Sequence, residues 1–266
     1  MEHTAQPQQR TENVRPALYN GFACIDDLKD RGWSSMVSDL SSMSLGGLGI
    51  DGWRVHWSRI YEFPWAYGAI LSCTALKAGQ EVLESGCGVT PLPFWLAAGG
   101  FHVTGVDLDR SCEPKWRSDG VPCRPDPSLT RFECGDMLDL PRRDESVDAV
   151  YSVSAVEHTS NRVKAVAEML RILKRGGLLV LTLDADICNT ALVSWPELFQ
   201  IQRLLETATT PALPCRHVVP SRLLTFENRT ITPQSANRLF LKRALDHVGW
   251  KPRYDQTIFA WAGRKL

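Results

Sequence analysis

Short apolar runs alternate with stretches of helical periodicity through the middle of the chain. The apolar runs predict five strands, at residues 81–84, 101–106, 128–133, 146–153 and 178–183. Helical spacing occupies residues 91–98 and 161–173, and the run 174–177 between the second helix and the last strand predicts a turn. Strands that alternate with helices predict βαβ units, and therefore a mostly parallel sheet with helices on both faces.

The regions on either side of this core, which we place at 76–185, have looser patterns. Residues 1–16 are polar and rich in Gln, Thr and Pro, which is typical of a disordered tail, and residues 17–75 predict a helical cap. An insertion is predicted at 186–240, with one helix at 195–207. Residues 241–266 are expected to complete the sheet with the end of a helix that begins at 232 and with a last strand from 254 to 261.

Composition and charge narrow the class of protein. The chain has 266 residues, of which 44% are hydrophobic and 23% charged, so it can bury an ordinary core. Thirty basic residues balance thirty acidic ones, which argues against a nucleic-acid or anionic-membrane partner. No apolar run reaches the roughly 20 residues of a spanning helix, and the N-terminus lacks the apolar core of an export signal. These features predict a cytoplasmic protein that acts without a membrane.

The eight cysteines do not form a metal-binding pattern. They are scattered, and none forms a C-x-x-C pair, so we expect free thiols in a reducing compartment and no metal site.

A glycine loop directly after the first predicted strand carries the chemistry. The segment 84–90 reads Glu-Ser-Gly-Cys-Gly-Val-Thr, and its glycines allow the backbone to turn sharply and approach a ligand closely. Pro91 suits the first turn of the helix that follows, whose free N–H groups would face the same ligand. Asp107 ends the next strand, where a carboxylate can accept hydrogen bonds from a ribose diol. The arrangement predicts a crevice for a nucleoside-containing cofactor.

The third residue after Gly88 decides between cofactors. A dinucleotide-binding fingerprint has glycine there, whereas this chain has Pro91. In this respect the loop resembles the class I S-adenosylmethionine (SAM)-dependent methyltransferase family, whose first motif is an acid followed by G-x-G. Segments 105–109, 134–137, 148–158 and 170–178 resemble the later motifs of that family, in the family's order. The resemblance implies a Rossmann-like, seven-stranded, mostly parallel sheet, with SAM as the cofactor.

The resemblance also implies roles for individual residues. Glu84 would hold the ammonium group of the methionine part, the loop backbone at Gly86, Cys87 and Gly88 would lie against it, and Asp107 would bind the ribose. Adenine would be held by Asp136, which accepts from its amino group, and by Met137, which would pack on the ring or offer its backbone N–H. The remaining cofactor-binding residues would be Leu108, after the second strand, and Ser152 and Val153, at the end of the fourth.

Candidate catalytic and acceptor-binding residues lie on either side of that motif. His158 is the leading candidate for a general base, because histidine with an ordinary pKa near 6.5 accepts a proton at neutral pH. Glu157 would orient the loop or touch the acceptor. In the aromatic segment before the first strand, Tyr61, Trp65 and Tyr67 could line an acceptor pocket, although core packing alone would also explain them. The insertion is an acceptor-binding lid, a homodimer contact or an addition to the core without either role, and all three remain open.

The sequence therefore predicts a methyltransferase that acts on an O or N atom of a small-molecule acceptor, in specialised or sugar-related metabolism. Two alternatives stay open. One is an NAD(P)-dependent oxidoreductase that uses the same crevice, and the other is a non-catalytic protein of the SAM-methyltransferase fold that binds a partner or serves as a regulatory subunit. Methylation of nucleic-acid bases is disfavoured by the neutral charge and by the lack of an N/D-P-P-Y motif.

Overall fold

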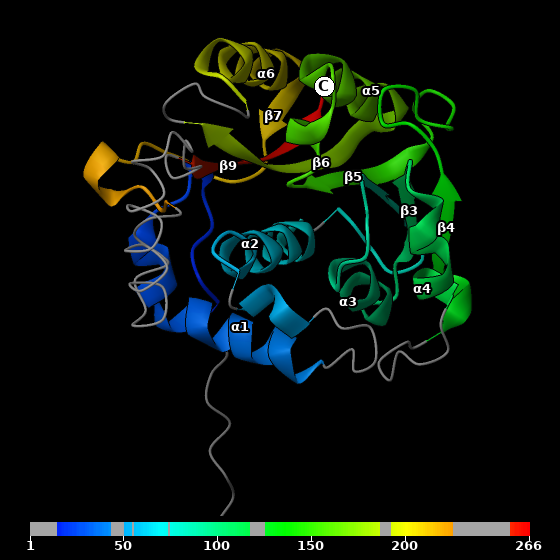
Figure 1. Cartoon of the computed structure of the whole chain (residues 1–266), viewed down its shortest axis with the longest axis horizontal. Helices are drawn as coiled ribbons and strands as arrows, with labels where there is room; N and C mark the ends of the chain where they lie inside the picture. Colours follow the sequence, from blue (N-terminus) through cyan, green and yellow to red (C-terminus); the bar gives the residue numbers. More distant parts are fainter. Residues whose placement is uncertain are drawn as a thin grey trace, which may run out of the picture.

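The five predicted strands form a continuous parallel block within one mixed sheet in the computed structural model (Figure 1). The structure describes residues 15–43, 51–54, 56–73, 75–117, 126–186, 193–225 and 256–266. The parallel strands lie in the order β4-β3-β2-β5-β6, with bounds β2 Glu81–Ser85, β3 His102–Asp107, β4 Thr130–Cys134, β5 Val147–Val153 and β6 Leu173–Asp186.

The other side of the sheet is built around β9, at Gln256–Lys265, which runs antiparallel to β6. The free edge of β9 pairs with two short strands, β1 (Asn20–Phe22) and β7 (Thr209–Pro211), and β8 (Cys215–Arg216) pairs with β1. The described sheet thus has nine strands instead of the predicted seven. The segment predicted as a helical cap also contributes a strand, β1, because its backbone pairs with the free edge of β9.

Helices cover both faces, as the alternating pattern predicts (Figure 1). On one face lie α1 (Arg31–Ser42), α2 (Arg59–Ser72), α3 (Leu92–Ala98) and α4 (Glu113–Arg117), and on the other α5 (Arg162–Ile172) and α6 (Trp195–Ala208).

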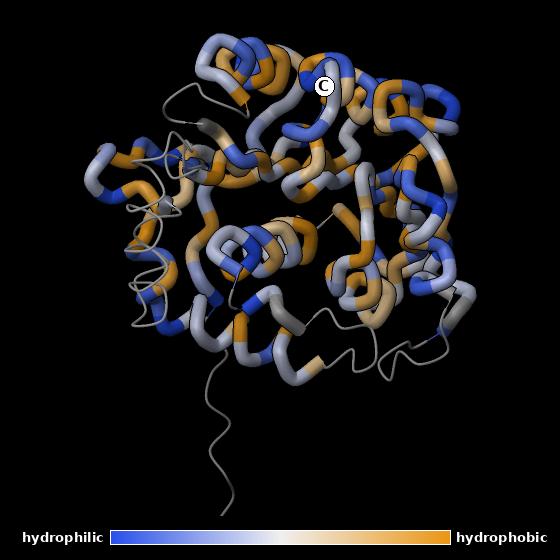
Figure 2. The backbone as a smooth tube through the Cα atoms, viewed as in Figure 1, coloured by the Kyte–Doolittle hydropathy of each residue, from blue (hydrophilic) through white to orange (hydrophobic). Residues whose placement is uncertain are grey.

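Strand β5 packs against the helices on both faces of the sheet. Ala149 and Tyr151 pack toward α2 and α3, whereas Val147 and Val150 pack toward α5. Figure 2 shows hydrophobic positions concentrated in the strands and on the helix sides that face them. Buried apolar side chains on both faces explain why the core strands read as nearly continuous apolar runs.

Two predicted boundaries differ from the structure. The turn predicted at 174–177 lies within β6, where the pairing jumps from Val147–Leu173 to Ala149–Leu178 and Gly176 adopts a φ of 74°. The strand therefore begins before the glycines and accommodates the extra residues as an irregularity. The helix predicted at 232–247 lies outside the described residues. No described helix has the length and apolar character that crossing a membrane requires.

Candidate functional site

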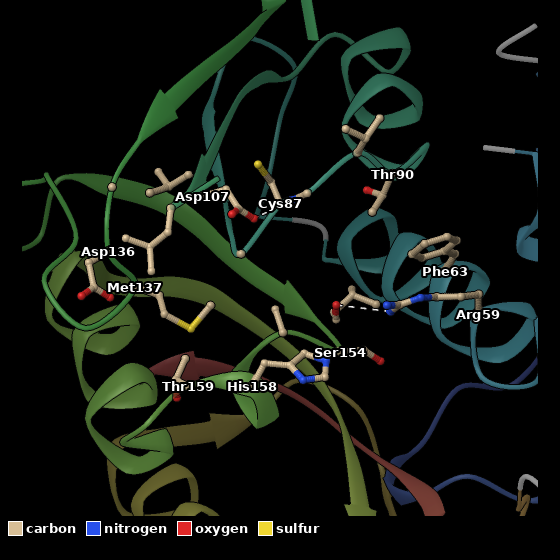
Figure 3. Close-up of a pocket in the computed structure, with 18 of the residues that line it drawn as sticks. Arg59, Phe63, Cys87, Thr90, Asp107, Asp136, Met137, Ser154, His158 and Thr159 are labelled. Atoms are coloured by element: carbon tan, nitrogen blue, oxygen red, sulfur yellow. Dashed lines mark hydrogen bonds between the residues drawn. The ribbon is translucent and has the colours of Figure 1, made fainter. Parts of the chain in front are cut away.

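A cavity of about 910 Å³ opens at the carboxyl ends of β2, β3, β4 and β5 (Figure 3). It lies where the chain reverses its direction of winding, because β3 and β4 follow β2 on one side while β6 follows β5 on the other. Ligands of open α/β sheets bind at such switch points. The volume is near the upper end of the range for small-molecule sites, about 300–1,000 Å³, so it leaves room for a cofactor and an acceptor together.

The glycine loop after β2 forms one wall of this cavity. Its backbone is fixed from below, since the Gly86 and Cys87 N–H groups both donate to Val106 O, at 2.8 and 3.2 Å. Gly86 has a φ of 75°, and a Cβ placed there would lie 2.5 Å from the Ala155 Cβ and 2.6 Å from the Met137 Cε. At Gly88, with a φ of 46°, a Cβ would meet no atom within 4 Å. The loop thus combines a crowded glycine with one that opens onto free space.

Trp116, on the short helix α4, supports the same loop from behind. Its indole N–H donates to Gly88 O at 2.8 Å, and the ring packs with Phe94 and Phe132 in a small buried cluster. The ring can approach β3 this closely because residue 105 is glycine: a Cβ there would lie 2.4 Å from two of the ring carbons. Sequence reasoning missed Trp116. The only signal for it was the glycine inside an apolar strand, which indicates a close approach.

Two of the predicted acids stand at the ends of adjacent strands and line the cavity. Asp107 accepts hydrogen bonds from the Gly88 N–H at 2.8 Å and from the Asp109 N–H at 2.9 Å. Asp136, after β4, accepts from the Leu138 N–H at 2.8 Å. Local backbone bonds thus orient both carboxylates. Among the other predicted cofactor residues, the cavity lining includes Gly86, Cys87, Gly88, Leu108, Met137 and Val153.

Glu84 and Ser152 lie beneath the cavity and do not line it. Glu84 is buried, and its Oε1 accepts from the Thr90 hydroxyl at 3.4 Å, while Thr90 itself faces the cavity. Its Oε2 is buried with no hydrogen-bond partner among the described residues, and burial raises the pKa of the carboxyl well above its usual range. The Ser152 hydroxyl donates to Ser85 O at 2.8 Å and so joins β5 to β2.

The end of β5 is held by a buried acid on α2 that sequence reasoning did not place in the site. Ser154, which lines the cavity, has a φ of 43°, and its hydroxyl donates to Glu62 Oε1 at 2.5 Å. The Thr182 hydroxyl donates to the same oxygen at 2.7 Å, and Arg59 lies 3.2 Å from the other oxygen. Three partners therefore satisfy Glu62, and a non-glycine residue is kept in the left-handed region at the mouth of the site.

The two residues predicted to be catalytic are separated by the structure. His158 is exposed and lines the cavity, whereas Glu157 is buried and does not line it. Glu157 accepts from the Asp184 N–H at 3.2 Å. Burial first, and then the charge of Glu62, raises the pKa of Glu157 to about 8. Burial and the same neighbouring carboxyls also raise the pKa of Asp184 well above its usual range.

Tyr61, Trp65 and Tyr67, predicted as acceptor-binding residues, lie outside the lining of this cavity. The Tyr61 ring stacks on Trp33 with centroids 4.8 Å apart, and the buried Trp65 indole donates to Tyr19 O at 3.0 Å. Tyr67 packs edge-on against Trp95.

The same segment does contribute other residues to the cavity, namely Trp53, His56, Arg59 and Phe63. Arg59 and Phe63 are one helical turn apart on α2, so they share a face, and the Arg59 guanidinium lies 5.4 Å from the Phe63 ring centroid. Partial burial first, and then the charge of Arg59, lowers the pKa of His56 and so favours the neutral imidazole. This wall supplies aromatic surface together with one cation.

Comparisons with known proteins agree with this geometry. A family model described as a methyltransferase domain matches residues 83–181. The chain is 32% identical to methyltransferase GfsG of Streptomyces halstedii over 117 residues, which is 42% of this chain and 39% of that protein. It is 27% identical to 24-methylenesterol C-methyltransferase 2 of Oryza sativa subsp. japonica over 180 residues, 67% of this chain and 46% of the relative.

Each of these alignments spans less than half the length of the relative. Among solved structures, geranyl diphosphate methyltransferase in complex with SAM has a similar fold, with a TM-score of 0.51, 15% identity and coverage of 94% of this chain and 99% of that one.

Proposed function

Because the chain belongs to the class I SAM-dependent methyltransferase family, we propose that it transfers a methyl group from SAM to an O or N atom of a small-molecule acceptor. The observation that carries this proposal is the single cavity that has acids and a glycine loop at one end and Arg59, Phe63 and His158 at the other. A donor and an acceptor held in one cavity can react without diffusing together, which is the main source of rate in such a transfer.

The cofactor end fits SAM by its donors, acceptors and free space. Asp107 and Asp136 stand on adjacent strand ends, where they would bind the ribose and the adenine amino group. Met137 would pack on the adenine, and Gly88 leaves free space where a side chain would otherwise project. The unsatisfied Glu84 Oε2 suits an ammonium group, which it would reach through a water molecule or through movement of Thr90.

The acceptor end would do three things. Trp53 and Phe63 offer aromatic surface for an apolar acceptor body. His158 faces the same space and would remove a proton from an acceptor that binds in its protonated form. When bound, SAM supplies a methyl group on a positively charged sulfur, and the residues of the chain orient the acceptor toward it. Glu157 would act indirectly, since it accepts a hydrogen bond from the Asp184 N–H and so fixes the loop after β5 to the end of β6.

Two measurements on the purified chain test this function. Isothermal titration with S-adenosylhomocysteine should show binding that Asp107→Ala weakens at least tenfold. Incubation with methyl-tritiated SAM and a panel of phenols, acids and amines should then label an acceptor. In that assay His158→Ala should lower turnover while S-adenosylhomocysteine affinity stays at the wild-type value. His217→Ala is the control, because His217 is exposed and does not line this cavity.

The same experiments separate the two alternatives. Binding of NADH without binding of S-adenosylhomocysteine would replace the proposal with an oxidoreductase. Failure to bind SAM and S-adenosylhomocysteine, without binding of NADH, would favour a non-catalytic protein of the same fold that binds a partner or serves as a regulatory subunit. Cytoplasmic location, a homodimer and a role in specialised or sugar-related metabolism stay predictions from the sequence.

A further inference from the structure

Arg59 and His158 approach the end of β5 from opposite sides of the cavity. In Figure 3 the Arg59 side chain extends from α2 toward the strand end, and the His158 ring reaches the same region from the loop after β5. The two polar contacts of Arg59 both use Nη1, at 3.2 Å from Glu62 Oε2 and 3.3 Å from Val153 O. The described residues provide no acceptor for its Nε and Nη2 groups. A guanidinium with one edge fixed and the other edge unused can bind a second oxyanion.

The charges around Arg59 favour an anion over a cation. Glu62 is its buried counter-ion, and the oxygens of Glu62 are also occupied by Ser154 and Thr182. The neighbouring carboxyls of Glu157 and Asp184 are disfavoured as anions by burial and by Glu62, so they contribute little further negative charge.

The two histidines at this end bear on the same balance of positive and negative charge. The lowered pKa of His56 favours its neutral form beside Arg59. His158 is the other histidine that lines the acceptor end of the cavity. The guanidinium is therefore the one fixed cation among the described residues that line the acceptor end.

We propose that the acceptor binds as an oxyanion, with its negatively charged oxygen between Arg59 and His158 and its planar apolar body against the aromatic surface that Trp53 and Phe63 form together. This inference rests on the proposed methyltransferase function and narrows its acceptor to a phenol, an enol or a carboxylic acid. For a phenol or an enol, His158 takes the proton, and a carboxylic acid arrives already ionised. The oxygen lone pair then forms the new O–C bond, the methyl carbon's bond to sulfur breaks, and sulfur keeps that electron pair.

The charge change during this reaction explains why an amine suits the site less well. Methylation of an oxyanion removes a negative charge and leaves an ether or an ester beside Arg59. Methylation of a neutral amine leaves an ammonium, whose positive charge would lie in a partly desolvated pocket beside another cation. Like charges at short range in such surroundings are repelled much more strongly than in water.

A spectroscopic probe tests the inference without a known acceptor. 4-Nitrophenol changes colour when it ionises, so its pKa can be measured when bound to the protein saturated with S-adenosylhomocysteine. We expect this pKa to fall by about one unit, which corresponds to tenfold tighter binding of the anion. 4-Nitrobenzylamine, a cation of similar shape, should bind at least tenfold more weakly than the phenolate. Equal affinities for the two probes would overturn the proposal.

Three variants separate charge recognition from structural support. Glu62→Gln removes the counter-ion of Arg59 but keeps an oxygen for Ser154 and Thr182, so nitrophenolate should bind several-fold more tightly. The double variant Arg59→Met/Glu62→Gln leaves no unpaired buried charge and should bind nitrophenolate at least tenfold more weakly than wild type. Arg54→Met is the control, because Arg54 is exposed, lies outside the cavity lining and should leave binding unchanged. Weaker nitrophenolate binding in both Glu62→Gln and the double variant would indicate a purely structural role and overturn the inference.

Binding of S-adenosylhomocysteine to every variant is the folding check. If the double variant fails it, Arg59→Lys preserves the charge beside Glu62 but removes the planar fork, and it should still weaken nitrophenolate binding. If the wild-type protein does not bind S-adenosylhomocysteine, the proposed function and this inference are both refuted. Normal binding without a preference for the anion would refute the inference alone.

Discussion

Substitution of alanine for Gly86 tests how closely the glycine loop must approach its neighbours. The added Cβ would lie 2.5 Å from the Ala155 Cβ and 2.6 Å from the Met137 Cε, well inside normal contact. Ala155 follows β5 and Met137 follows β4, so the overlap would push apart two loops that form the cavity. The backbone at Gly86 also has a φ of 75°, which a residue with a Cβ rarely adopts.

These two effects set the size of the expected loss. A left-handed conformation costs roughly 1–2 kcal/mol for a non-glycine residue. Overpacking of a tight site adds about 1–3 kcal/mol. We therefore expect Gly86→Ala to lower the free energy of unfolding by about 2–5 kcal/mol. Gly88→Ala has no such overlap, so only the backbone cost of roughly 1–2 kcal/mol applies to it.

The assay compares stability and cofactor binding for this pair of variants. Urea denaturation should show the larger loss for Gly86→Ala, and titration with S-adenosylhomocysteine should show weakened binding in both, because both positions line the cavity. If Gly86→Ala were as stable as Gly88→Ala, the crowding at Gly86 would not be a constraint on this loop and the reasoning would be refuted.

Three further predictions concern groups around the cavity. Trp116→Phe removes the hydrogen bond to Gly88 O, and should cost about 1–2 kcal/mol of unfolding free energy and weaken S-adenosylhomocysteine binding several-fold; unchanged affinity would contradict its supporting role. Because the pKa of Glu157 is raised to about 8, the folded protein keeps a proton that the unfolded chain gives up at lower pH. Denaturation at several pH values should therefore show that wild type loses up to about 1.4 kcal/mol per pH unit relative to Glu157→Gln between roughly pH 5 and 8, and a pH-independent difference would refute this. Since burial raises the pKa of Glu84, binding of a ligand with an ammonium group should release a proton at neutral pH; calorimetry in buffers of different ionisation enthalpy would detect it in wild type and not in Glu84→Gln.

The residues that line the end of the cavity at the glycine loop were largely predictable from the sequence because they follow strand ends, while their role in binding a cofactor stays a prediction. Gly86, Asp107 and Asp136 each come at or just after the carboxyl end of a parallel strand, and such ends meet at one edge of the sheet. Glu84 and Ser152 were placed in the same group, but they lie inside β2 and β5. Side chains inside a strand point toward the faces of the sheet, so these two pack beneath the cavity.

Which side chains of α2 line the cavity depends on the rotation of this helix about its own axis, and local sequence patterns do not specify that rotation. Arg59 and Phe63 share one face of α2, whereas Tyr61 and Trp65 are two residues out of phase, which is close to half a turn around the helix. The direction in which each face points is set by distant contacts, such as the Trp65 indole with Tyr19 O. The sequence therefore indicated that an aromatic segment lies beside the cavity, but not which of its side chains line the cavity.

The pairing of β1 with β9 has a consequence for the order in which the molecule assembles. The Asn20 side chain donates to Ala262 O at 2.9 Å and accepts from the Ala262 N–H at 2.7 Å, across 242 residues of chain. On a ribosome, residue 20 emerges long before residue 262, so this seam has to wait until synthesis is nearly finished. The same early segment holds α2 through Tyr19. We expect the wall that carries Arg59 and Phe63 to be the last part of the cavity to become fixed, after the glycine loop and its acids.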